Sequence, residues 1–324
     1  MNKNKINVCQ VSLLNNLEII RKNYHQFKKF YYDTDFYLIC PDNSLNKFKD
    51  NFSDIQINLI NENEIINFDV FKNIANSYLI KSNYFEKIQP RLKWYYQQVL
   101  KISYLIDFIE TKDESMIIWD ADTLILKKIN FFNDYSSNIF GTTSEYFRAY
   151  YKTNKTIFNS LPKYFISSLC QFTTLNTVEC KNLVNQLSKY KDREKNLSEW
   201  ITSIIFSAIL NTHKEYNGSM FSEYELIGQS KLIYNLQKQN LISGVREGLN
   251  GKLTYSQELI VKILNYKYVA YEQADSNNDN KEILSKKQTW TKFIFLIINK
   301  TSNKFFRSIK YYITLNYMKF IKWD

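Results

Sequence analysis

The chain has few of the residues that interrupt regular structure, with only 6 Gly and 3 Pro among 324 residues. This scarcity excludes collagen-like, linker-rich and extensively disordered classes. Long apolar runs are also missing, because no stretch approaches the length of a transmembrane helix. The N-terminus begins with basic residues, but Asn7, Gln10 and Ser12 interrupt its apolar run, which argues against a signal peptide. The sequence therefore predicts a cytoplasmic protein that does not span a membrane.

Cysteine and histidine are also scarce, with 4 Cys and 2 His. The sequence has no CxxC pair and no Cys/His cluster with zinc spacing. We expect the cysteines to be buried free thiols in a reducing compartment. They are Cys9, Cys40, Cys170 and Cys180.

Positive charge is concentrated at the C-terminus. The net charge is +11, but residues 281–324 hold ten Lys or Arg against two acidic residues, which gives +8 and leaves +3 for the first 280 residues. A general nucleic-acid surface needs a basic folded body. The distribution argues against a nucleic-acid partner, although a basic nucleic-acid-binding protein stays an alternative of another class.

Strand and helix patterns alternate along the chain. Period-2 stretches around a helical stretch at 17–30 form a strand-helix-strand start. The alternation predicts an α/β fold with a mostly parallel mixed sheet and helices on both faces. We expect residues 131–165 to be rich in loops. The predicted strands are 6–14, 36–40, 55–61, 116–119 and 165–175, and the predicted helices are 17–30, 91–111, 177–190 and 198–211, with another after the stretch that begins at 219.

A polar stretch, "ADSNNDNK" at 274–281, predicts a domain boundary. We divide the chain into a body at 1–273, a linker at 274–288 and a basic amphipathic helical tail at 289–324. In the tail an apolar stripe opposes Lys residues, which is typical of an interfacial helix on an anionic membrane. The alternative is a helix packed on the body with a solvated Lys face. The stripe consists of Phe306, Ile309, Ile313, Tyr317 and Phe320.

Two carboxylates follow a buried strand in "IIWDADTLILKKI" (117–129, the aspartate block). Asp120 and Asp122 point the same way in extended geometry. They lie where α/β sheets bind ligands, beyond a strand's carboxyl end. Side by side they repel unless a cation lies between them, and hard oxygen ligands suit Mg²⁺ or Mn²⁺. Such an ion can stabilise a diphosphate leaving group. The alternative is a solvated turn.

Two further stretches carry a resemblance together with the aspartate block. They are "RLKWYYQQVLK" (91–101, the helix block) and "FSEYELIGQS" (221–230, the glutamate block). The aspartate block resembles the Asp-x-Asp segment of nucleotide-sugar-dependent glycosyltransferases with a GT-A-like (Rossmann-like) fold. The other two resemble, in the same order, segments of the DUF6492-type bacterial family, found among surface-polysaccharide enzymes. Lys93 departs from that pattern, because a small Gly is expected before the Trp-Tyr pair.

The resemblance implies donor-binding roles. Asp122 would be the direct metal ligand, and Asp120 would contact the ribose or a metal-bound water. The start of a helix with Arg91 and Lys93 nearby suits an anion. Three further side chains of the helix block would reach donor sugar or phosphate, the alternative being a solvated polar face. They are Gln97, Gln98 and Lys101.

The glutamate block offers a general base. Glu223 and Glu225 again stand at i and i+2, and transfer with inversion needs a base for the acceptor hydroxyl. Glu223 is the first candidate and Glu225 the second, and the alternative is a surface turn with two solvated acids. His213 is a candidate third metal ligand, the alternative being a surface histidine.

Together these features imply a glycosyltransferase of hexosyltransferase type that depends on Mn²⁺ or Mg²⁺. Its donor would be a nucleotide-diphosphate sugar, with a UDP-sugar expected. Its acceptor would be a glycan or a lipid-linked acceptor in the synthesis of bacterial surface polysaccharide, such as lipopolysaccharide O-antigen or capsule. The tail would hold it at the inner face of the cytoplasmic membrane. The alternative enzyme is a Mg²⁺-dependent nucleotidyltransferase or sugar-phosphate transferase, which the absence of a Gly-rich loop near the N-terminus disfavours.

Overall fold

The computed structural model describes ten stretches of the chain. The predicted linker 274–288, the predicted tail 289–324 and the candidate ligand His213 lie outside them. The described residues are 5–80, 85–132, 139–141, 147–160, 168–188, 195–212, 219–233, 240–242, 244–245 and 255–271.

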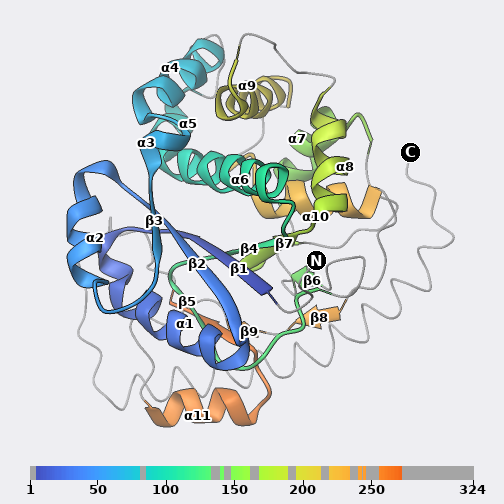
Figure 1. Ribbon diagram of the computed structural model, residues 1–324. Helices are drawn as coiled ribbons and strands as arrows, with labels where there is room; N and C mark the ends of the chain where they lie inside the picture. Colours follow the sequence, from blue (N-terminus) through green and yellow to red (C-terminus); the bar gives the residue numbers. More distant parts are fainter. Residues whose placement is uncertain are drawn as a thin grey trace, which may run out of the picture.

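A five-stranded sheet forms the centre, in the order β3-β2-β1-β4-β7 (Figure 1). The first four strands are parallel to their neighbours, and β7 runs antiparallel to β4. In the register of β1, Val8 lies between Phe36 and Ile117. The predicted mostly parallel mixed sheet is confirmed. Its strands are β1 (Lys5–Val11), β2 (Asp33–Cys40), β3 (Asn58–Asn61), β4 (Met116–Trp119) and β7 (Phe172–Leu175).

One face of the sheet is covered by α1 (Leu17–Phe30), which matches the predicted helix. Ile20, Asn23 and Phe27 are fully buried at helical spacing. Phe27 packs against Trp119 of β4, with ring centroids 5.3 Å apart. This contact places the last turn of α1 against the carboxyl end of β4.

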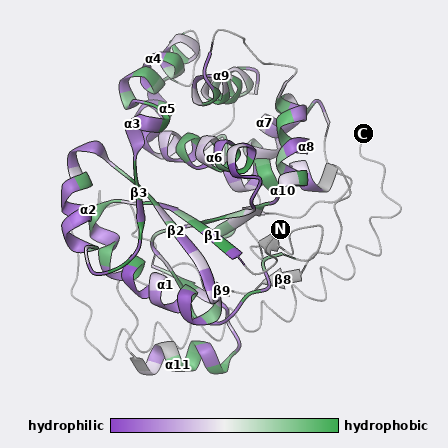
Figure 2. Ribbon diagram, in the orientation of Figure 1, coloured by the Kyte–Doolittle hydropathy of each residue, from purple (hydrophilic) through white to green (hydrophobic). Residues whose placement is uncertain are grey.

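The opposite face is covered by α6 (Leu92–Lys112), which packs against α9 (Leu197–Leu210) (Figure 1). Apolar residues dominate α9, so it extends the core (Figure 2). For the polar side of the helix at 91–111, a solvated face was the alternative to donor binding. The structure instead buries Gln98 and Lys101, because α10 (Glu223–Ile233) also contacts α6.

The remaining elements extend both layers. Short strands form two further sheets, in the orders β5-β10-β9 and β6-β8. The other helices are α2 (Leu45–Asn51), α3 (Glu62–Ile65), α4 (Phe68–Leu79), α5 (Phe85–Ile88), α7 (Arg148–Phe158), α8 (Thr177–Ser188) and α11 (Tyr255–Ile263). The short 3-10 helices are η1 (Leu14–Asn16), η2 (Asp42–Ser44) and η3 (Gln89–Arg91). The other strands are β5 (Thr123–Ile125), β6 (Ile139–Gly141), β8 (Asn240–Ile242), β9 (Gly244–Val245) and β10 (Tyr268–Ala270).

Two expectations about local structure are corrected. Residues 131–165 were expected to be loop-rich, but they contain α7, whose Tyr150, Tyr151 and Ile157 are buried. Their spacing is helical, and the aromatic composition concealed it. The glutamate block was expected to precede a helix, whereas α10 begins inside it at Glu223.

All four cysteines are buried free thiols, as expected. Burial raises the pKa of the Cys40 thiol to about 12, so it is protonated at neutral pH. None of the helices in the described stretches is both long enough and apolar enough to cross a membrane.

Candidate active site

The site lies beyond the carboxyl ends of β1 and β4, two parallel neighbours in the sheet. The chain leaves β1 toward β2 on one side, and β4 lies on the other. This is the topological switch point at which α/β sheets bind ligands. Immediately after β4 comes the turn Asp120–Thr123, closed by a bond from the Thr123 amide to the Asp120 carbonyl (3.0 Å).

The turn is held from beneath by buried groups. The Thr123 carbonyl accepts hydrogen bonds from Asn23 Nδ2 of α1 (2.6 Å) and from Trp119 Nε1 (2.7 Å). The Asn23 side chain also accepts from the Ile125 amide (3.0 Å). Because these groups are buried, each lost bond would leave a polar atom unsatisfied. The two aspartates therefore project from a rigid backbone.

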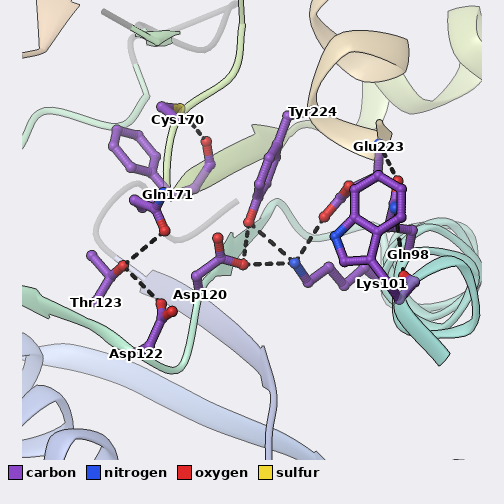
Figure 3. Close-up of polar contacts among 11 residues, drawn as sticks. Gln98, Lys101, Asp120, Asp122, Thr123, Cys170, Gln171, Glu223 and Tyr224 are labelled. Atoms are coloured by element: carbon purple, nitrogen blue, oxygen red, sulfur yellow. Dashed lines mark hydrogen bonds and ion pairs between the residues drawn. The ribbon is translucent and has the colours of Figure 1, made fainter. Parts of the chain in front are cut away.

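Four side chains meet beside this turn, and we call them the lysine cluster: Lys101, Asp120, Glu223 and Tyr224 (Figure 3). Lys101 Nζ lies 2.6 Å from Asp120 Oδ1, 2.8 Å from Glu223 Oε1 and 3.3 Å from the Tyr224 hydroxyl. The Tyr224 hydroxyl in turn donates to Asp120 Oδ1. An ammonium has three N–H donors, and all three are used inside the protein.

The cluster joins all three blocks singled out in the sequence. Lys101 comes from α6, Asp120 from the end of β4, and Glu223 with Tyr224 from the first turn of α10. Gln98 Oε1, also on α6, accepts from the Glu223 backbone amide (3.1 Å), which satisfies one of the free amides at the start of α10. The blocks are therefore in direct contact, although 122 residues separate Lys101 from Glu223.

Burial and charge set the protonation of the lysine cluster. Burial alone lowers the pKa of Lys101, but the nearby Asp120 and Glu223 carboxylates outweigh it and raise that pKa overall. Burial raises the pKa of the Glu223 carboxyl, with repulsion from Asp120 adding to the effect and Lys101 opposing it. Burial and the two carboxylates raise the pKa of Tyr224, so its hydroxyl remains a donor.

The two aspartates differ in their surroundings. Asp120 Oδ1 takes both cluster bonds, while its Oδ2 accepts none from the described residues, and 18% of the side chain is exposed. Asp122 is half-buried, and the Thr123 hydroxyl lies 3.2 Å from its Oδ1. One oxygen of Asp120 is therefore oriented by the protein and the other is left for a ligand.

Asp120 and Asp122 offer oxygen ligands of the kind that Mg²⁺ and Mn²⁺ prefer. The described stretches hold no group of three or more His, Cys, Asp or Glu side chains that would bind a metal unaided. Mg²⁺ often uses only one or two carboxylates and takes its other ligands from water and substrate phosphates. With both acids ionised, the lysine cluster has one negative charge in excess, which favours a cation. Asp120 and Asp122 fit that mode of binding.

The remaining candidates in the helix block lie farther away. Arg91 ends η3 and caps the start of α6, ten positions before Lys101 and about 15 Å away along the axis. Its guanidinium stacks on the Trp94 ring (4.7 Å). Lys93 is exposed. Gln97 is half-buried one turn before Lys101, on the same side of the helix. The structure thus groups Gln98 and Lys101 with the aspartates, but not Arg91 or Lys93.

Glu225 is fully buried and faces another segment. Its Oε1 accepts from the Ser168 amide (3.2 Å) and its Oε2 from Gln229 Nε2 (3.3 Å). Since Glu223 is also buried, the alternative of a surface turn with two solvated acids is wrong. The two glutamates, two residues apart on a helix, have different partners.

Three residues of the site were not predicted from the sequence. Tyr224 stands between the two glutamates, so its position in the glutamate block was a usable signal. Thr123 directly follows the aspartates and could have been found in the same way. Gln171 offered no local signal, because only the fold brings it to the turn, where its carbonyl accepts from the Asp120 amide (2.9 Å).

Fold and site together define an α/β protein with a cluster of buried charged side chains at the switch point of its sheet. The chain belongs to the family of unknown function DUF6492, whose family model matches residues 10–307. The match extends past the described residues, through the predicted linker and into the tail.

No curated protein matches the sequence. Among solved structures, the chain is similar to the apo form of mouse xyloside xylosyltransferase 1, with 8% identity and a TM-score of 0.40, over 86% of this chain and 100% of that one. It is also similar to the PaToxG glycosyltransferase, with 12% identity and a TM-score of 0.32, over 64% of this chain and 69% of that one. At TM-scores this low the two likenesses carry no argument about function, which must come from the residues.

Proposed function

We propose that this protein is a glycosyltransferase that depends on Mn²⁺ or Mg²⁺ and takes its sugar from a nucleotide-diphosphate sugar. The observation that carries the proposal is the meeting of the helix, aspartate and glutamate blocks in the lysine cluster at the sheet's switch point. A buried ammonium shared by two carboxylates is costly to assemble, so a purely structural role explains it poorly.

Different residues of the site would bind the donor and the cation. Lys101 and Tyr224 hold Asp120 by one oxygen, leaving the other for a ligand. Asp122 and Asp120 would hold the divalent ion, which when bound offsets negative charge on a diphosphate leaving group. Gln97 would lie within reach of the donor, since it is half-buried one turn before Lys101.

Glu223 is the proposed base for the acceptor hydroxyl. Its Oε1 is held by Lys101, whereas its Oε2 accepts no hydrogen bond from the described residues. The pKa of this carboxyl is raised by burial, which brings it nearer to the range in which general bases work. Glu225 is the weaker choice, because its oxygens accept from Ser168 and Gln229.

Acceptor and location follow from the sequence of the tail. The basic amphipathic stretch 289–324 would bind the anionic inner face of the cytoplasmic membrane and bring the site to a lipid-linked or growing glycan. A glycan of bacterial surface polysaccharide, such as O-antigen or capsule, fits that placement. A hexose carried on UDP is the donor proposed first.

A thermal-shift screen tests the proposal most directly. Each nucleotide sugar is added with Mn²⁺, with Mg²⁺ or with EDTA, because a ligand that binds the folded state raises the unfolding temperature. We expect a shift with one nucleotide-diphosphate sugar that requires the metal. Equal shifts with a nucleoside triphosphate and a sugar phosphate would favour a nucleotidyltransferase. No shift with any nucleotide sugar in either metal would count against the proposal.

A further inference from the structure

The Asp122 carboxylate is linked to a residue far away in the sequence. The Thr123 hydroxyl lies 3.2 Å from Asp122 Oδ1 and 3.2 Å from Oε1 of Gln171 (Figure 3). Thr123 is fully buried and Gln171 is 3% exposed. Since the Gln171 carbonyl also accepts from the Asp120 amide, this one residue contacts the turn through both its backbone and its side chain.

The hydroxyl of Thr123 has a single hydrogen, so it can donate to only one of these two oxygens. Exchanging the oxygen and nitrogen of the Gln171 amide removes the conflict, and such an exchange is a matter of assignment. With the amide in that orientation, Gln171 Nε2 would donate to Thr123, and Thr123 would donate to Asp122 Oδ1. The result is a directional chain that ends on the carboxylate.

Gln171 belongs to a stretch that α10 holds in place, and we call residues 168–171 the support segment. Glu225 of α10 accepts from the Ser168 amide (3.2 Å). Gly228, one turn farther along, lies so close to Ser168 that a Cβ there would be 1.8 Å from its Oγ and 2.3 Å from its Cβ. Only glycine permits this approach, so α10 determines where the support segment lies.

We propose that Gln171 and Thr123 are positioning residues that hold the Asp122 carboxylate for a divalent cation, and that α10 sets the place of Gln171 through Glu225 and Gly228. This inference rests on the proposed function, because it takes Asp122 as a metal ligand. Partners that orient a ligating side chain commonly matter 10–100-fold for metal affinity. The inference also gives a role to Glu225 and Gly228, in the second half of the glutamate block, which take no part in the lysine cluster.

The first test compares Thr123→Val with Thr123→Ser. Valine keeps the shape but removes the hydroxyl, and serine keeps the hydroxyl. Mn²⁺ is titrated into metal-free protein, and the free-ion signal is followed by electron paramagnetic resonance, which does not depend on activity. We expect Thr123→Val to weaken Mn²⁺ binding about tenfold and Thr123→Ser to restore it. Thermal unfolding of each variant verifies that it is folded.

The second test changes residues that do not contact the aspartates. It adds side-chain volume on α10 and then removes volume from the support segment. Gly228→Ala forces Ser168 to shift and should weaken Mn²⁺ binding. Adding Ser168→Gly removes the two atoms that the new Cβ would meet, so the double variant should recover. A loss caused by general destabilisation would follow the unfolding temperature, whereas a positioning effect appears in folded protein.

The outcomes separate the two proposals. If wild-type protein binds Mn²⁺ and Thr123→Val binds it equally well, the positioning role is wrong and the proposed function stands. Loss of binding in Thr123→Ser as well as in Thr123→Val would also overturn the hydrogen-bond chain. If wild-type protein binds no Mn²⁺, even with nucleoside diphosphates present, both proposals fail.

Discussion

Lys101 and Glu223 form a buried ion pair, with Nζ 2.8 Å from Oε1, across 122 residues of sequence. Their side chains are only 4% and 5% exposed. Asp120 shares the same ammonium at 2.6 Å. Because one ammonium is paired with two buried carboxylates, removing any of the three changes the electrostatic energy of the other two.

Lys101→Met is expected to lower the free energy of unfolding by about 3–5 kcal/mol, because it leaves two acids without their cation. Tyr224→Phe removes no charge but takes a hydroxyl from both Asp120 and Lys101, so it should cost less, about 1–3 kcal/mol. Urea unfolding monitored by circular dichroism measures both. The double variant Lys101→Met/Glu223→Gln should regain part of the loss, and a Lys101→Met protein as stable as wild type would contradict the ion-pair account.

The pH dependence of stability should report Glu223. The pKa of this carboxyl is raised in the folded protein, so the folded state binds its proton more readily than the unfolded chain does. Its contribution to stability is therefore fully present below the unfolded pKa and is lost as the pH rises through the folded pKa. Glu223→Gln abolishes the titration, so the stability of this variant relative to wild type should improve as the pH rises above the unfolded carboxyl value of about 4. Urea unfolding across that range measures it, and a constant or opposite difference would contradict the raised pKa.

Asp122→Ala is expected to abolish metal-dependent hydrolysis or transfer of the donor while the fold survives. The side chain is only half-buried, so its removal should cost less stability than the loss of a fully buried charged group. Donor turnover with and without Mn²⁺ measures the effect, and thermal unfolding verifies the fold. Full activity in this variant, with no requirement for metal, would refute the proposed mechanism.

The two glutamates of α10 should behave differently. Glu223→Gln is expected to reduce the transfer rate far more than donor affinity, because a base acts only on the acceptor hydroxyl. Glu225→Gln keeps the buried shape and one acceptor oxygen, so it should affect mainly the free energy of unfolding. Initial rates and donor titrations on both variants make the comparison. A selective loss of transfer in Glu225→Gln instead would reverse the assignment of the base.

Deleting residues 289–324 is expected to release the protein from anionic vesicles, because these residues contain the basic apolar stripe. Co-sedimentation with phosphatidylserine-containing vesicles, at low and high salt, measures the partition. Binding of the intact chain should weaken with salt, since screening reduces the attraction of Lys residues to the surface. Vesicle binding that is unchanged by the deletion would reject the membrane role of the tail.

Much of the fold could be predicted from the sequence, wherever a segment had one clear helical or strand periodicity of apolar residues. The helix at 17–30 was predicted with its observed bounds, because its buried positions repeat at helical spacing and it leads into a clear strand. The strand at 55–61 was predicted too long, since the structure places β3 at Asn58–Asn61 only. The helix α7 was missed because its aromatic residues were taken as loop composition.

Part of the candidate site could be predicted from the sequence. Asp120 and Asp122 stood out because carboxylates at the end of a buried strand have a clear physical cost. Gln98 and Lys101 were picked out as polar residues of a helix, but their partners could not be inferred. Arg91 and Lys93 were grouped with them because they are close in sequence. In space, the length of α6 separates them from the site.

The sequence by itself determined the strand that ends in two aspartates, the helices around it and the concentration of charge in the tail. These depend on local periodicity, which each segment carries in its own residues. Only the tertiary structure decided that Lys101 binds Glu223, that Glu225 supports another segment and that Gln171 reaches the aspartate turn. Those contacts depend on how α10 packs against α6 and the support segment, and no local pattern encodes such a long-range placement.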